Sequence, residues 1–269
     1  KTLAFAVMRC ARVAQRGKCC RSLSSSTPGF LEMRTDRVKP ECMRTYVAAY
    51  EKGCSMRKQL FPGWLGTWES EAGCSMYNVH SLYQWADYAD RVETRDCADD
   101  NSMWYLHRPE LRQAIVDTTT TMMVEATDAL ASCGLPGYAG FARSEGTLPA
   151  RLPGEPFVLP VAYELRTYQL HLGYETVPKF LELFTAGLRD KLANDDTGAS
   201  QLVTLLYTDS GRLNTVIELW RHENIQRSQD SRRASRKAPA WRKAVNEIAN
   251  LAISFDTQFI RPIPSSPWQ

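Results

Sequence analysis

The second half of this chain shows the clearest pattern of apolar and polar residues. Across residues 161–170, Tyr163 and Leu165 fall on one face and Glu164 and Arg166 on the other. This two-residue period is that of a β-strand, whose successive side chains point to opposite sides. We therefore expect the second half to open with a strand.

The elements after this strand are predicted from helical spacing, turns and caps. A proline suits the first turn of a helix, a turn rich in Gly and Ser joins two β-rich runs, and asparagine is a good helix N-cap. These signals predict a helix from about Pro178, strands at 201–207 and 213–220, helices after Asn224 and Pro239, and a strand at 253–260.

The first half repeats this order of elements. Its predicted strands and helices are a strand at Phe30–Val38, a helix from about Glu41 to Leu60, a hairpin around Gly73, helices to Asp117 and a strand at Thr118–Glu125. Strand, helix, strand, strand, helix, strand is the ferredoxin-like order, in which the helices cover one face of a four-stranded sheet. The other face of each sheet is left bare.

The two halves are also similar in sequence. The string LEMRTDRVKP from Leu31 returns as YELRTYQLHL from Tyr163, at an offset of 132 residues. That spacing is too long for a solenoid, whose units run about 20 to 50 residues, and it suits a duplicated domain. We predict an α+β fold of two tandem ferredoxin-like (βαββαβ) repeats, packed sheet to sheet as an intrachain pseudo-dimeric α+β barrel.

Composition and charge narrow the class of protein. The chain has 269 residues, 43% of them hydrophobic, and a net charge of +3, which is too weak a bias for a nucleic-acid-binding protein. The sequence contains no apolar run long enough for a transmembrane segment. All eight cysteines precede the second repeat. A duplicated disulfide scaffold would carry them in both halves, so we expect reduced thiols, and no zinc site.

The N-terminal segment differs from the rest. Residues 1–29 contain six basic residues, no acid and a serine cluster, which is typical of a mitochondrial presequence. We expect this tail to lie against partner subunits in a large assembly, since alone it lacks the apolar surface to offset its ordering. The predicted organisation is this basic tail, a first repeat at 30–130, a Gly/Pro-rich linker at 131–160, and a second repeat with a C-terminal tail at 161–269.

Three strings carry a family resemblance. The string YELRTYQLHLGYETVPKF from Tyr163, GRLNTVIELW from Gly211 and the ending PIPSSP resemble the NIPSNAP family across essentially all of residues 163–267. The first repeat resembles it as a more divergent copy. The resemblance implies tandem domains related to dimeric α+β barrels and a mitochondrial association. It carries over no catalytic residues, and for some members it implies recruitment of autophagy factors.

The repeated Glu-Arg pairs are the first candidate site. We expect Glu32 and Arg34, with Glu164 and Arg166, to project into the barrel interior, where they could bind an anionic ligand. The alternative, which we favour, is that the four charges pair with one another across the pseudo-twofold axis. Neither strand offers a histidine, thiol or serine placed for catalysis, so we assign no catalytic, cofactor-binding or metal-binding residue.

Other candidates have structural explanations that we favour. We expect His222 to be a capping or surface residue rather than a haem ligand, and the basic run Arg227–Lys243 to be a solvated helix face rather than a lipid-docking surface. The remaining tryptophans should pack in the core: Trp64, Trp68, Trp85, Trp104, Trp220 and Trp241. Trp268 is expected to be exposed and to anchor in a neighbour's groove.

These observations predict a non-catalytic mitochondrial protein. We expect an accessory or scaffolding subunit of a large assembly, such as a respiratory-chain complex, peripheral to the matrix side of the inner membrane. Its partners would be protein subunits, with contact to anionic lipid possible, and no cofactor is expected. Two alternatives remain: a barrel-interior enzyme of monooxygenase type or haem binder, and a signalling or autophagy adaptor. Differences between the repeats, such as Tyr83 against Trp220, argue against a shared enzyme pocket.

Overall fold

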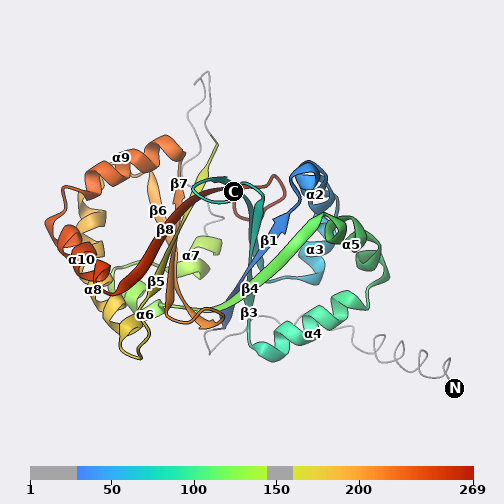
Figure 1. The fold of residues 1–269 in the computed structure, drawn as a ribbon, viewed down its shortest axis with the longest axis horizontal. Helices are drawn as coiled ribbons and strands as arrows, with labels where there is room; N and C mark the ends of the chain where they lie inside the picture. Colours follow the sequence, from blue (N-terminus) through green and yellow to red (C-terminus); the bar gives the residue numbers. More distant parts are fainter. Residues whose placement is uncertain (1–28, 144–159) are drawn as a thin grey trace.

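Eight antiparallel strands close into a single barrel in this computed structural model, which describes residues 29–143 and 160–269 (Figure 1). The order of strands around the barrel is β1-β3-β2-β8-β5-β7-β6-β4. Their bounds are β1 Phe30–Val38, β2 Trp64–Ala72, β3 Asn78–Trp85, β4 Ile115–Glu125, β5 Ala162–Leu170, β6 Ser200–Ser210, β7 Thr215–His222 and β8 Ala252–Pro262. The expected α+β barrel is confirmed at this level.

The two halves of the chain join through their outer strands. β2 pairs with β8, where Trp68 lies opposite Pro262, and β4 pairs with β6, where Val124 lies opposite Tyr207. These two ladders satisfy the backbone groups that an open sheet edge would leave unpaired. The faces expected to be bare therefore become the inside of one barrel.

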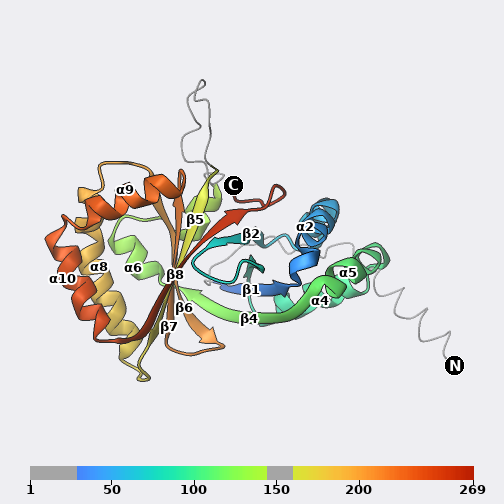
Figure 2. The same ribbon diagram turned by 45° about the horizontal axis from the view of Figure 1, so that its top comes forward.

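Helices cover the outside of the barrel on two opposite sides (Figures 1 and 2). The first side carries η1 Pro40–Cys42, α2 Met43–Lys52, α3 Cys54–Leu60, α4 Tyr88–Asp99 and α5 Ser102–Ala114. The second side carries α8 Thr176–Asn194, α9 Ile225–Ser235 and α10 Pro239–Ala249. Two short helices, α6 Thr127–Ser132 and α7 Gly137–Arg143, follow β4.

In the first half, a helix and a strand differ from the prediction. The single helix expected from Glu41 to Leu60 is divided at Gly53, which is the C-cap of α2 and the N-cap of α3. Glycine weakens a helix interior because its backbone is the least restricted in the unfolded chain. The strand expected from Thr118 begins instead at Ile115, where its pairing with β1 shifts by a bulge between Arg37 and Val38.

The segment predicted as a linker, 131–160, is partly helical. It includes α7, whose Phe141 is buried in the cluster that fills the barrel. Residues 144–159 of this segment, and residues 1–28 of the basic tail 1–29, lie outside the described residues, so the partner contacts expected of the tail stay a prediction.

Candidate functional site

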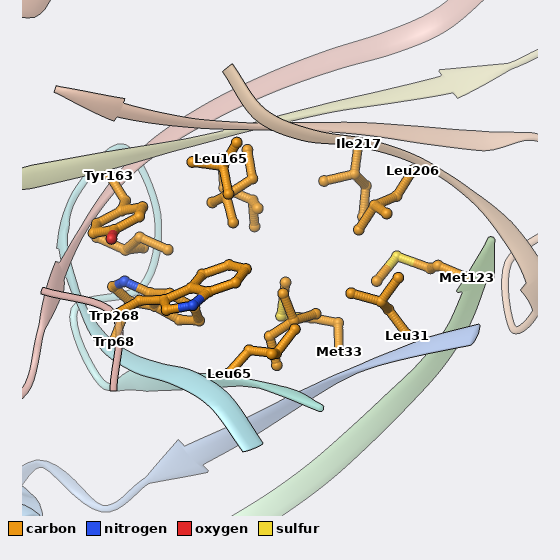
Figure 3. Close-up of a cluster of buried hydrophobic side chains, with 14 of the residues drawn as sticks. Leu31, Met33, Leu65, Trp68, Met123, Tyr163, Leu165, Leu206, Ile217 and Trp268 are labelled. Carbon is orange, nitrogen blue, oxygen red and sulfur yellow. The ribbon is translucent and has the colours of Figure 1, made fainter. Parts of the chain in front are cut away.

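The barrel interior is filled by apolar side chains from both halves (Figure 3). Leu31 and Met33 of β1 meet Tyr163 and Leu165 of β5 in this cluster, and all four are buried. They are the apolar positions of the two repeated strands. The interior is thus a packed core, built from the residues that alternate with the Glu-Arg pairs.

Trp268 belongs to the same cluster, which corrects the expectation of an exposed anchor. Its indole is 4% exposed and packs edge to face against Trp68, with ring centroids 6.2 Å apart, and against Phe141 at 4.7 Å. Its backbone N–H donates to the carbonyl of Leu65 at 3.2 Å. The chain therefore buries its terminal aromatic side chain in its own barrel, where the apolar surface is removed from water.

The repeated Glu-Arg pairs face the helices and not the interior, so that expectation was wrong. Glu32 is held by Arg91 and Arg95 of α4, and Glu164 is held by Arg232 of α9. The predicted pairing across the pseudo-twofold axis was also wrong, because each carboxylate is neutralised within its own half. A buried charge needs partners, and here the helices supply them.

In the second half, Glu164 is the centre of a buried network. Arg166 Nε donates to its Oε1 at 2.8 Å, Thr257 Oγ1 donates at 2.7 Å, and Arg232 forms a further ion pair. Burial alone would raise the pKa of Glu164, but the hydrogen bond from His222 and the charge of Arg166 hold that pKa far below its usual range. Glu164 is therefore ionised, and its neighbours stabilise the carboxylate with hydrogen bonds and positive charge.

His222 lies in this network and is neither a cap nor a surface residue, which corrects that expectation. The ring is 1% exposed, with Nε2 3.1 Å from Glu164 Oε2 and Nδ1 2.7 Å from Ser200 Oγ. Burial lowers the pKa of His222, although Glu164 opposes that effect. A neutral ring donates from Nε2 to Glu164 and accepts at Nδ1 from Ser200, so both nitrogens are satisfied.

A second buried cation lies beside this network. Lys191 Nζ is 3.3 Å from the centroid of the Trp220 ring, and burial lowers its pKa to about 7. Glu218 is close by, accepting from Trp220 Nε1 at 2.5 Å and from Arg166 Nη1 at 3.5 Å. Neither Lys191 nor Glu218 was predicted from the sequence as a site residue. Lys191 could have been found as a charged residue at helical spacing from the apolar Phe184 and Leu188.

The first half has the same framework with different side chains. Opposite Glu32 and Arg34 on the neighbouring strand lie Tyr83 and Ser81, whereas opposite Glu164 and Arg166 lie Trp220 and Glu218. Trp85 Nε1 donates to Glu32 Oε2 at 2.9 Å, in the place that His222 takes beside Glu164. The two halves thus share a scaffold and differ in what fills it.

Arg57 is the counterpart of Lys191. Each is a buried cation near a tryptophan, Arg57 near Trp104 of α5 and Lys191 near Trp241 of α10. The two tryptophans occupy matching positions, in the helix before the last strand of each half. The Arg57 guanidinium lies 3.8 Å over the Tyr50 ring, and its Nη1 donates to Tyr83 Oη at 2.7 Å. It borders a cavity of about 170 Å³ between the sheet and the helices. The helix-facing side of the sheet is therefore the candidate site.

The remaining candidates are structural. The predicted core tryptophans are confirmed, since all six are buried. In the basic run, Arg232 points inward to Glu164, while Arg227 and Arg233 pair with Asp230 on the surface of α9. Among the described residues, no group of His, Cys, Asp or Glu could hold a metal ion, and no helix is long and apolar enough to cross a membrane.

The closed antiparallel barrel with helices outside defines a protein of the α+β barrel class. The NIPSNAP family model matches residues 31–129 and 163–267, so the chain belongs to the NIPSNAP family. Human NipSnap homolog 3A is 24% identical over 238 residues, which cover 88% of this chain and 85% of that protein.

Two solved structures share the fold at low identity. An anthrone oxidase-like protein superposes with a TM-score of 0.53 at 10% identity, covering 88% of this chain and 92% of that one. Chlorite dismutase from Candidatus Nitrospira defluvii gives a TM-score of 0.50 at 10% identity, covering 89% and 93%. At this level of identity the likeness concerns the fold alone.

Proposed function

We propose that this chain is a non-catalytic interaction protein of the mitochondrion, an accessory subunit of a large inner-membrane-associated assembly such as a respiratory-chain complex. The observation that carries the proposal is an exposed apolar patch at one end of the second half. Its members are Leu172 (81% exposed), Tyr174 (100%), Leu213 (52%), Ile253 (57%) and Phe255 (51%). Contiguous exposed apolar surface marks sites of protein–protein contact.

The apolar patch is held together by backbone and side-chain hydrogen bonds. His171 N donates to Leu251 O at 2.9 Å, which fixes the loop after β5 beside the start of β8. Asn214 Nδ2 donates to the carbonyls of His171 and Gly173 at 2.8 and 2.9 Å, which joins that loop to the β6–β7 turn. Phe255 stacks on Tyr168, with ring centroids 4.4 Å apart. A preformed surface of this kind loses little conformational entropy on binding.

A groove of about 600 Å³ adjoins the patch and strengthens the proposal. Tyr174 lines it together with Val177 and Leu181 of α8 and Tyr207 of β6. An apolar side chain of a partner subunit would fit this groove in the way that anchor residues fill pockets at interfaces. The basic tail at 1–29 would add contacts to protein or to anionic lipid on the matrix side of the inner membrane.

The fold fits a scaffold. We take the barrel to be two tandem ferredoxin-like (βαββαβ) repeats, 30–130 and 161–269, joined by the 131–160 linker. Its interior is packed with Leu31, Leu165 and Trp268. That packing favours a supporting role over the barrel-interior enzyme or haem binder.

Native gel electrophoresis of detergent-solubilised mitochondria tests the proposal. The tagged full chain is expected to migrate with a large complex, and the double variant Leu172→Ser/Tyr174→Ser to migrate as a free protein. The matched control is Val92→Ser/Met103→Ser, two exposed apolar residues of the first half, which should leave migration unchanged. A free pool of the unaltered chain, or co-migration of the patch variant, would exclude the proposal. Protease protection in intact organelles separates a matrix protein from an adaptor that faces the cytosol.

A further inference from the structure

The first half contains a buried arginine that no carboxylate of the described residues pairs with. Arg57 is 7% exposed, and its partners among the described residues are the Tyr83 hydroxyl and the rings of Tyr50, Trp64 and Trp104. Its Nε has no hydrogen-bond partner within the described part of the chain. A buried cation is costly unless an anion neutralises it. The charge of Arg57 therefore has no carboxylate counter-ion in the part of the chain that the structure describes.

The second half shows what the first half has lost. There the carboxylate of Glu218 lies near the buried Lys191 and Arg166, and the Trp220 indole covers Lys191. At the matching positions of β3 stand Ser81 and Tyr83. Replacing glutamate by serine removes the counter-charge, and replacing tryptophan by tyrosine removes side-chain volume. One copy thus carries its own anion, and the other has a cavity in its place.

The cavity has a basic and aromatic lining. Its arginines are Arg34, Arg57, Arg95 and Arg112, and its acids are Asp36 and Asp99. Arg34 is already paired with Asp36 at 3.0 Å, and Arg95 with Glu32 at 2.7 Å. Asp36 also accepts from Tyr46 and Thr118, so its oxygens are occupied. Arg57 and Arg112 have no carboxylate partner among the described residues, and Arg112 is exposed to solvent, so Arg57 is the buried cation able to take a ligand.

We propose that this cavity binds a small organic carboxylate with a flat apolar body, seated against Arg57. A guanidinium presents paired donors that match the two oxygens of a carboxylate. The rings of Tyr50, Tyr83, Trp85 and Trp104 form the apolar lining. The volume of the cavity, about 170 Å³, fits a ligand with one aromatic ring. A cavity of about 150 Å³ holds benzene, whereas pockets for drug-sized ligands are about 300–1,000 Å³. At about 170 Å³ the cavity excludes a nucleotide.

Isothermal titration calorimetry of the full chain with benzoate tests this site. We expect saturable binding of one benzoate per chain, with a dissociation constant of about 1 mM or tighter. Benzamide has the same shape without the charge and should bind at least tenfold more weakly. Inorganic phosphate, which lacks the apolar body, should also bind at least tenfold more weakly. No benzoate binding, or benzamide or phosphate as tight as benzoate, would overturn the proposal.

Two variants and a control locate the binding. Ser81→Glu supplies the carboxylate that Glu218 supplies in the second half, and Arg57→Met removes the cation; each should abolish benzoate binding. Lys191→Met changes the equivalent buried cation in the other half and should leave the affinity within twofold. Circular dichroism establishes which variants fold. One folded variant, either Ser81→Glu or Arg57→Met, is enough to test the site. Benzoate binding that survives in a folded variant, or that Lys191→Met removes, would contradict the site. None of these results depends on the apolar patch or its partner.

Discussion

His222 Nε2 lies 3.1 Å from Oε2 of Glu164, and both side chains are almost fully buried. This contact belongs to a network in which Glu164 also forms ion pairs with Arg166 and Arg232. We expect Glu164→Gln to lower the free energy of unfolding by about 3–5 kcal/mol, because Arg232 loses its carboxylate and the buried Arg166 keeps only the 3.5 Å contact with Glu218. Urea unfolding followed by circular dichroism measures the loss.

Glu32→Gln is the matched control in the other repeat. Glu32 is as buried as Glu164, but the side chains of both its partners, Arg91 and Arg95, are 21% and 33% exposed. Of the partners of Glu164, Arg232 is 35% exposed but Arg166 only 10%. Water can therefore solvate Arg91 and Arg95 once the anion is gone, and we expect a smaller loss of about 1–3 kcal/mol. Equal losses for the two variants would show that burial of the network does not set its energy.

Lys191 predicts a pH dependence of stability. Burial, with Arg166 nearby, lowers its pKa from an ordinary 10.5 to about 7, against the opposing charges of Glu218, Asp195 and Glu164. Between pH 7 and 10.5 the unfolded chain keeps a proton that the folded chain has lost, so this group makes stability rise with pH. Below pH 7 both states carry the proton and the dependence vanishes.

Comparison of the unaltered chain with Lys191→Met isolates this effect. The difference in free energy of unfolding should shift in favour of the unaltered chain by up to about 1.4 kcal/mol per pH unit between pH 7 and 10. Lys179→Met is the control, since Lys179 is exposed and pairs with Glu182 on the surface of α8. A difference that is flat across this range would contradict the assignment.

The strands could be predicted from the sequence, but the direction of their faces could not. The alternation gave β1 as Phe30–Val38, the bounds that the structure has. It also separated Leu31 and Met33 from Glu32 and Arg34. It did not say which set lies inside, because in a barrel covered by helices both faces are buried. The ion-pair partners of the glutamates determine which face is turned toward the helices. These partners, Arg91 and Arg232, come from helices far along the chain.

The cavity beside Arg57 could not be predicted from the sequence, for a related reason. Its recognition depends on Ser81 facing Arg34 while Glu218 faces Arg166. Arg166 lies 132 residues after Arg34 (166 − 34), whereas Glu218 lies 137 residues after Ser81 (218 − 81). Because the second half gains residues between these strands, equal offsets along the chain do not identify equal positions in space.

Trp268 should contribute to stability. Its burial against Trp68 and Phe141 predicts that Trp268→Ala lowers the free energy of unfolding by about 3–5 kcal/mol. Trp268→Phe keeps an aromatic ring in the cluster and should cost less. Chemical denaturation of the purified chain measures both losses. A loss below about 1 kcal/mol for the alanine variant, together with weaker partner binding, would favour the exposed anchor instead.

Gly53 and Gly187 provide a test of how tightly the helices pack in each half. A Cβ at Gly187 in α8 would lie 2.6 Å from the Cβ of Ala244 and 3.1 Å from the Cα of Trp241. Both atoms belong to α10, so the two helices are in contact at this glycine. We expect Gly187→Ala to lower the free energy of unfolding by about 1–3 kcal/mol, since the helices must separate.

The same substitution at Gly53 should be tolerated. A Cβ there would meet Ala49 O at 3.5 Å and the Trp104 ring at 3.9 Å, which are ordinary contacts, and the backbone φ of −85° suits alanine. Gly53→Ala is therefore expected to change the free energy of unfolding by less than about 1 kcal/mol. Any increase would come from the lower conformational entropy of the unfolded chain. Thermal and urea unfolding of the two variants together check this. A large loss at Gly53 would mean that α2 and α5 pack as closely as α8 and α10, and would remove the room that the cavity beside Arg57 requires.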